Sequence, residues 1–151
     1  MTATQDREIA RRVALALVPD DATLPIGPRF GWLPADLAAT PWMFNLSYDN
    51  TSWAQSMVLR LPDGTELDID MGPTTPLEMM PPGARPITVR GMAARYAPAD
   101  PARLAFTTPD GIRVWMQLDR RHADPTPDDL VHIAEQLDLG PWPDMSWVGT
   151  R

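Results

Sequence analysis

The tripeptide Pro-Asp-Gly occurs twice, as Pro62–Gly64 and Pro109–Gly111, and each copy separates two runs of alternating apolar and polar residues. Proline suits the second position of a type I turn, and glycine readily adopts the left-handed conformation that closes a three-residue hairpin loop with a bulge. Two such hairpins constrain the fold more than any other feature of the sequence, because a hairpin loop also sets which residues face each other.

The three-residue loop places apolar residues opposite one another in both hairpins. In the first hairpin it pairs Arg60 with Glu66, whereas a two-residue loop would set Leu59 against Asp68. The expected facing pairs are Leu59 with Leu67, Met57 with Ile69, Phe106 with Val114, Leu104 with Met116, and Ala102 with Leu118.

Alternation and turn signals predict the other elements. The predicted strands are 30–32, 42–48, 53–61, 65–71, 87–89 and 93–97, with the hairpin Leu104–Leu118, a kink at Gly91 and a proline-rich loop over Gly72–Pro86. Helices are predicted over Thr4–Leu17 and Pro127–Leu137, the latter capped by Thr126, and one helical turn over Pro34–Leu37.

Two amphipathic helices and one sheet face that needs covering indicate the α+β class. We predict a twisted, mostly antiparallel sheet of about six or seven strands, with the N-terminal and the C-terminal helix packed on one face. No shift in composition marks a domain boundary, so residues 1–151 are expected to form a single domain.

Composition excludes several kinds of partner and site. The net charge of −7 argues against nucleic acid or an anionic membrane as the main partner. The absence of cysteine removes thiol nucleophiles, disulfides and thiolate metal sites. Neither a membrane helix nor a signal peptide is expected, because the longest apolar stretch, Val13–Val18, is far too short.

Three carboxylates, Glu66, Asp68 and Asp70, fall on one face of a predicted strand. Such a row could bind a hard cation or perform acid–base chemistry, but residues two apart along a strand are spread farther than calcium ligands usually are, so a solvated face is expected. His122 and His132 lack a second histidine or a glutamate at metal-site spacing and are expected at surface or boundary positions. We predict neither a metal ion nor a cofactor.

Methionine and tryptophan supply the candidate contact residues. Trp42 and Trp53 are in phase with the apolar faces of their strands and are expected in the core. The remaining candidates for ligand or partner contact are Met71, Met79, Met80, Trp115, Trp142 and Trp147. Loop methionines covering an apolar groove are one interpretation of this set, and a C-terminal tail that folds back on the sheet is another.

The order of these features resembles a known family. Gly31–Leu37 is similar to the Gly-Trp-Leu-Pro-x-x-Leu opening of uncharacterised actinobacterial extracytoplasmic domains, and the similarity continues through Pro86–Gly91, a strand, a hairpin and the helix Asp128–Leu137. Similar modules occur in anti-sigma factors and in proteins with a lipoprotein-carrier-like curved sheet. The resemblance covers about Phe30 to Leu139 and implies a non-enzymatic, extracytoplasmic domain that senses or binds a molecule, with no catalytic residues to carry over.

The leading hypothesis is a non-enzymatic binding or sensory module of unknown ligand. A hydrophobic small molecule or a protein would contact the concave sheet face or the Met- and Trp-rich loop and tail. A second hypothesis is a protein–protein interaction domain, of an adaptor or immunity type, that uses the acidic surface. The third is an unrecognised enzyme working with Asp68, Asp70 or His122, which requires a pocket where these residues converge.

Overall fold

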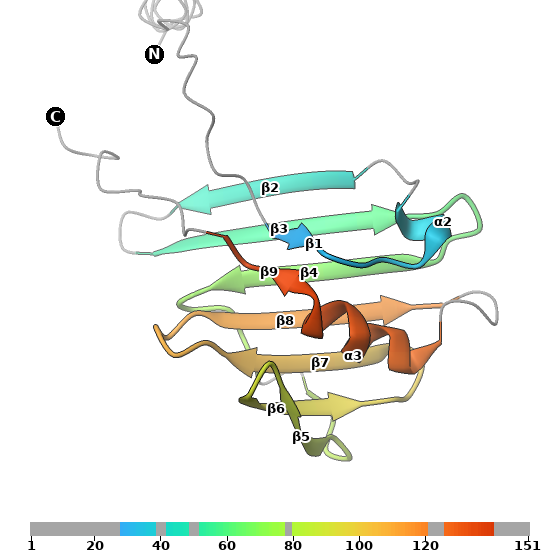
Figure 1. Cartoon of the computed structure of the whole chain (residues 1–151). Helices are drawn as coiled ribbons and strands as arrows, with labels where there is room; N and C mark the ends of the chain where they lie inside the picture. Colours follow the sequence, from blue (N-terminus) through green and yellow to red (C-terminus); the bar gives the residue numbers. More distant parts are fainter. Residues whose placement is uncertain (1–27, 39–41, 49–51, 78–79, 121–125, 141–151) are drawn as a thin grey trace, which may run out of the picture.

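The structure is a computed structural model that describes residues 28–38, 42–48, 52–77, 80–120 and 126–140. A sheet of seven antiparallel strands dominates it, in the order β2-β3-β4-β8-β7-β6-β5 (Figure 1). The strands are β2 Trp42–Tyr48, β3 Trp53–Arg60, β4 Glu66–Gly72, β5 Arg85–Val89, β6 Met92–Ala97, β7 Ala102–Thr107 and β8 Arg113–Asp119. The prediction of a mostly antiparallel sheet of six or seven strands is confirmed.

Both Pro-Asp-Gly hairpins have the predicted register. Arg60 faces Glu66 in the β3–β4 pair, and all five predicted apolar pairs face each other. Gly64 and Gly111 adopt φ values of 89° and 87°, the left-handed conformation that the three-residue loop requires. The turn sequence therefore determines which side chains of four strands lie on the same sheet face.

Gly91 has a different role from the predicted kink. Arg90 and Gly91, with φ values of 53° and 75°, form a two-residue turn that joins β5 to β6 and sets Val89 opposite Met92. Positive φ at both central residues is the signature of the tight hairpin turn whose twist matches the strands. The Arg90 backbone N–H donates to the Glu135 carboxylate at 2.9 Å, which ties this turn to the C-terminal helix.

The described residues contain two helices, α2 Ala35–Ala38 and α3 Pro127–Glu135. α2 is the single turn predicted around Pro34–Leu37, and α3 corresponds to the predicted C-terminal helix. The N-terminal helix predicted over Thr4–Leu17 lies outside the described residues. At the start of α3, the Asp129 carboxylate accepts hydrogen bonds from both the backbone N–H and the hydroxyl of Thr126. The Asp129 backbone N–H in turn donates to the Thr126 carbonyl at 3.1 Å, so the two residues bond each other in both directions at the start of the helix.

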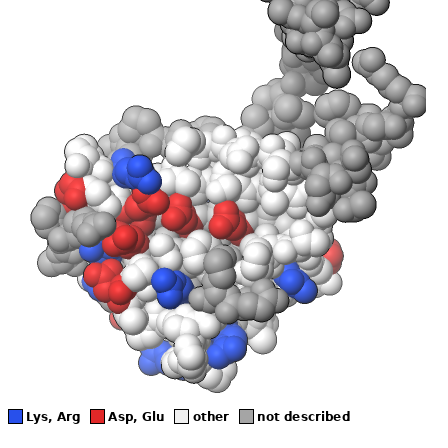
Figure 2. Space-filling model, turned by 180° about the vertical axis from the view of Figure 1, so that it is seen from behind, with Lys and Arg blue, Asp and Glu red and all other residues white. Residues whose placement is uncertain are grey.

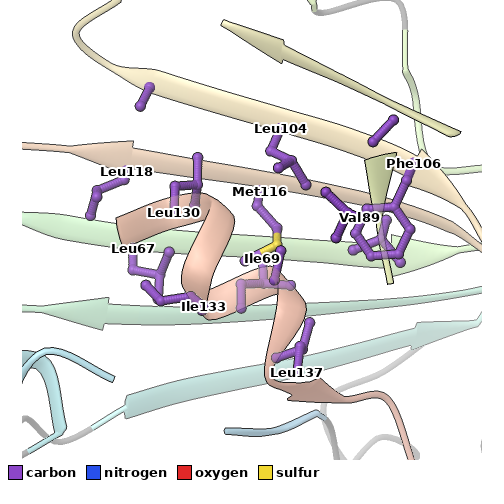
Figure 3. Packing of buried hydrophobic residues seen from close by; sticks show 14 of the residues in the cluster. Leu67, Ile69, Val89, Leu104, Phe106, Met116, Leu118, Leu130, Ile133 and Leu137 are labelled. Carbon is purple, nitrogen blue, oxygen red and sulfur yellow. The ribbon is translucent and has the colours of Figure 1, made fainter. Parts of the chain in front are cut away.

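α3 lies across β7 and β8 and covers one face of the sheet, which we call the helix face (Figure 1). Leu130 and Ile133 of α3, and Leu137 shortly after it, point toward the sheet (Figure 3). All three side chains are buried. Strand side chains of the opposing layer include Leu67, Ile69, Leu104, Phe106, Met116 and Leu118. The main hydrophobic core therefore lies between α3 and the central strands.

A two-stranded sheet, β1 Arg29–Phe30 with β9 Leu137–Asp138, joins the first described segment to the chain that leaves α3. The Gly31 N–H donates to the Gln136 carbonyl at 2.9 Å, and a Cβ on Gly31 would lie 2.8 Å from that oxygen. Glycine at this position therefore permits the close approach of the two segments.

The opposite face of the seven-stranded sheet is crossed by segment 73–84, which carries the chain from β4 to the far edge strand β5. We call this face the crossover face and the segment the crossover segment. Residues 78 and 79 of the segment lie outside the described part of the chain. Two cavities on this face border the described residues of the crossover segment.

Candidate functional site

One transverse row of side chains organises the crossover face. The pairing registers place one residue from every strand in this row, in sheet order Asn45, Ser56, Asp70, Trp115, Ala105, Arg95 and Pro86. The row is polar over β2 to β4, aromatic at β8 and mainly apolar with one arginine from β7 to β5. Its composition thus divides the face into two chemically different halves.

Trp115 lies at the centre of that row, beneath the crossover segment. It is 7% exposed and belongs to a small apolar cluster with Met80, Ala97 and Ala105, against which Leu77 and Ala84 pack. Its indole Nε1 is buried without a hydrogen-bond partner in the described part of the chain. The sequence pattern places Trp115 on the polar face of its strand. In the structure, residues of the crossover segment pack against Trp115 and cover it.

An apolar groove of about 500 Å³ borders this cluster on the side of β5, β6 and β7. Leu77, Met80 and Ala105 belong to the cluster and also line the groove, so the groove is continuous with the packing around Trp115. The remaining lining residues are Pro86, Ala93, Ala94, Arg95, Phe106 and Thr107. The Arg95 guanidinium donates a hydrogen bond to the Ala84 carbonyl at 3.4 Å, which places it beside the end of the crossover segment.

A second, polar pocket of about 210 Å³ lies on the other side of the crossover segment, over β2, β3 and β4. Its polar side chains are hydroxyl, amide and carboxyl groups, supplied by Asn45, Ser47, Ser56, Asp70, Thr74 and Thr75, and Ala54, Gln55 and Pro76 complete the lining. Gly72 helps to form this corner, since a Cβ there would lie 2.5 Å from the Trp53 carbonyl oxygen. The crossover segment therefore lines the polar pocket with its first residues and the apolar groove with its later ones.

The predicted row of carboxylates is present on the crossover face and is extended by Asp119, which faces Glu66 across the β4–β8 pair. We call Glu66, Asp68, Asp70 and Asp119 the carboxylate patch, and Figure 2 shows acidic residues gathered on this face. Arg60 forms an ion pair with Glu66. A hydrogen bond from Arg60 lowers the pKa of Glu66, whereas burial, together with the charges of Glu66 and Asp70, raises the pKa of Asp68 to about 6.

A third cavity, of about 380 Å³, lies between α3 and the strands β5 and β6 on the helix face. Its ionisable groups contact one another: Arg85 stacks over the Tyr96 ring at 5.5 Å, and Tyr96 bonds Asp128. Burial, followed by the charge of Asp128, raises the pKa of Tyr96. His132 lines the same cavity and meets the Trp32 ring edge-on, with ring centroids 4.3 Å apart. The contact between Tyr96 and Asp128 joins α3 to β6, and the contact between Trp32 and His132 joins α3 to the segment after β1.

The structure brings two of the six predicted contact residues together, since Met80 and Trp115 belong to one cluster. Met71 lies on the helix face, is fully buried in the main core and lines neither the groove nor the polar pocket. Its position follows from the strand alternation that also places Leu67 and Ile69 inside. Met79, Trp142, Trp147 and His122 lie outside the described residues.

The sequence analysis missed the polar pocket and the groove's arginine. Asn45 and Ser56 face each other, and Ser56 faces Asp70, in a row that follows from the strand registers once β2 and β4 are both paired with β3. The sequence contains the signal for this row in the alternation of each strand. The path of the crossover segment, which closes both cavities, has no comparable periodic signal.

The described residues contain no group of three or more histidine, aspartate or glutamate side chains arranged to hold a metal ion. Within the same described ranges, no helix is long and apolar enough to cross a membrane. Comparison with protein-family models, with curated proteins and with solved structures found no match to this chain.

Proposed function

We propose that this chain is a non-enzymatic binding module that holds a small molecule with an apolar body in the groove beside the crossover segment. The observation that carries the proposal is the groove itself, with a volume of about 500 Å³ and walls of leucine, methionine, alanine and proline side chains. Pockets of roughly 300 to 1,000 Å³ with mostly apolar walls and a few polar groups are typical of small-molecule sites.

The walls of the groove favour binding over chemistry. Its described polar side chains are Thr107 and Arg95, of which a guanidinium is always protonated and serves to orient an anion through paired N–H donors. A ligand with an alkyl chain and a terminal carboxylate fits this combination. Met80 supports the fit, because a flexible thioether side chain adapts to irregular apolar partners.

Titration with decanoate, monitored by amide chemical shifts, tests the proposal. We expect saturable shifts at residues of the groove, and weaker binding of the uncharged analogue decanol. Ala93→Trp should weaken decanoate binding at least tenfold, because Ala93 is exposed and lines the groove, so that an indole there fills it. Ala99→Trp is the matched control, since Ala99 is exposed and does not line the groove. Equal affinity of Ala93→Trp and the unmodified protein, with unchanged melting of both, would overturn the proposal.

The carboxylate patch favours a second candidate function, a contact surface for a basic protein. On the crossover face of β3 and β4, the carboxylates of Glu66, Asp68 and Asp70 outnumber the single guanidinium of Arg60. Charge complementarity of this kind accelerates and orients association. An affinity for a basic partner that falls steeply with NaCl concentration would support this function, and an affinity independent of salt would exclude the patch as its basis.

A further inference from the structure

We propose that the polar pocket between β2, β3, β4 and the crossover segment is a binding site for a primary ammonium group. The pocket is separate from the apolar groove, and it rests on different residues. The sources of such a group are a free alkylamine and the lysine side chain of a partner protein, which share the same chemistry at the site.

The lining of the pocket matches the needs of an ammonium ion. A protonated amine has three hydrogen-bond donors and no acceptor, so its site must supply oxygen acceptors. Asn45, Ser56, Asp70 and Thr74 supply an amide, two hydroxyl groups and a carboxylate. The register sets Asn45 beside Ser56 and Ser56 beside Asp70, which brings three of these groups into one row.

The charge distribution also favours a cation. Asp70 is the charged side chain among the described lining residues, and Glu66 and Asp68 precede it at every second position of β4. On the neighbouring strand β8, Arg113 is opposite Gly72 and donates to the Thr75 carbonyl at 3.5 Å, so it is a cation close to the pocket. Asp119 faces Glu66 at the other end of β4. With Arg60 paired to Glu66, the face around the pocket keeps an excess of negative charge.

The size of the pocket sets the size of the ligand. A volume of about 210 Å³ admits an ammonium group with a short alkyl chain, and it is smaller than the usual pocket for a drug-sized molecule. Thr75, which is 4% exposed, forms part of the inner wall of the pocket, and its backbone N–H donates to the Gly72 carbonyl at 3.3 Å in the first turn of the crossover segment. The site is therefore largely formed before a ligand arrives.

The test uses n-butylammonium as the probe and n-butanol as its neutral isostere, each titrated into the full chain and followed by amide chemical shifts. We expect saturable shifts at Ser56, Asp70 and Thr74 with n-butylammonium and none with n-butanol. Nα-acetyl-lysinamide serves as the second arm: stronger binding of this compound points to a partner's lysine, and stronger binding of n-butylammonium points to a free amine.

Two variants separate the pocket from the general charge of the face. Asp70→Asn should weaken n-butylammonium binding at least tenfold, and Ser56→Leu should do the same while keeping every charge, because the larger side chain fills the pocket. Asp119→Asn removes a carboxylate outside the pocket and should change the affinity less than twofold. Equal weakening by Asp119→Asn and Asp70→Asn, or equal binding of n-butanol, would overturn the proposal. None of these variants alters the apolar groove, so decanoate binding reports independently on the first proposal.

Discussion

At the scale of single residues, the glycines of the Pro-Asp-Gly turns give the most direct link between sequence and fold. Gly111 has a φ of 87°, and a Cβ built on it would meet no atom within 4 Å, so only backbone strain opposes a substitution there. Gly111→Val should destabilise the protein by about 1 kcal/mol or more, because a β-branched residue resists the left-handed conformation.

Thermal or urea unfolding measures this effect, and Gly83→Val is the matched control. A Cβ on Gly83 also meets no atom within 4 Å, but its φ lies outside the left-handed range, so this variant should unfold close to the unmodified protein. Equal stability of the two valine variants would contradict the assignment of strain to the Gly111 turn.

The titration of Asp68 should affect stability. Its folded pKa of about 6 lies above that of an unfolded aspartate, roughly 3.9, so the folded state binds more protons between these pH values. The contribution of Asp68 to stability should therefore fall as pH rises from about 4 to about 6, and this loss should stay constant above that.

Asp68→Asn keeps the shape of the neutral acid without its charge. Because solvent screens a partly exposed carboxylate, we expect this variant to gain about 1 kcal/mol at pH 7.5 rather than the full value of the pKa shift. The gain should vanish near pH 4, where Asp68 in the folded protein is already protonated. Urea unfolding at both pH values measures it, and an equal gain at pH 4 would show that charge is not its cause.

At the scale of elements, periodicity and turn chemistry predicted most of the sheet. β2 was predicted with its observed bounds, and both long hairpins with their registers, because a period of two and a defined turn specify strand pairing locally. Gly91 was interpreted as a kink instead of a turn, since Arg90 at positive φ gives no sequence signal of the kind that Asn-Gly would. α3 is shorter than predicted because Leu137 leaves the helix to pair with Phe30 in the small sheet.

The cavities were harder to predict than the strands that line them. Met80 was identified as a contact candidate from composition, but Leu77 and Arg95 join it only through the path of the crossover segment and the pairing of β6 with β7. Such contacts depend on residues distant in the sequence, which local patterns do not encode. Met71 is a different case, because the alternation of its strand already indicates that it is buried, and only its residue type marked it as a contact candidate.

At the scale of the whole molecule, two meanders meet at the β4–β8 pair, so that the centre of the sheet is closed by a pairing between distant parts of the chain. β4 and β8 each have a strand on both sides, whereas β5 is paired on one side by β6 and ends the sheet order. An edge strand presents unpaired backbone groups that invite further pairing, and proteins reduce this hazard in several ways, proline among them.

In the edge strand β5, Pro86 reduces the number of backbone groups available for further pairing, because proline has no N–H to donate. In a hairpin closed by the Arg90–Gly91 turn, Val89 and Ile87 direct their N–H groups to β6, and Thr88 directs its N–H outward. We expect the Thr88 amide to exchange with solvent roughly 100-fold faster than the Ile69 amide at the centre of β4, which opens only with the sheet. Hydrogen exchange followed by NMR measures both. Equally slow exchange at Thr88 would mean that another strand pairs with this edge in solution, and the seven-stranded sheet would then be part of a larger one.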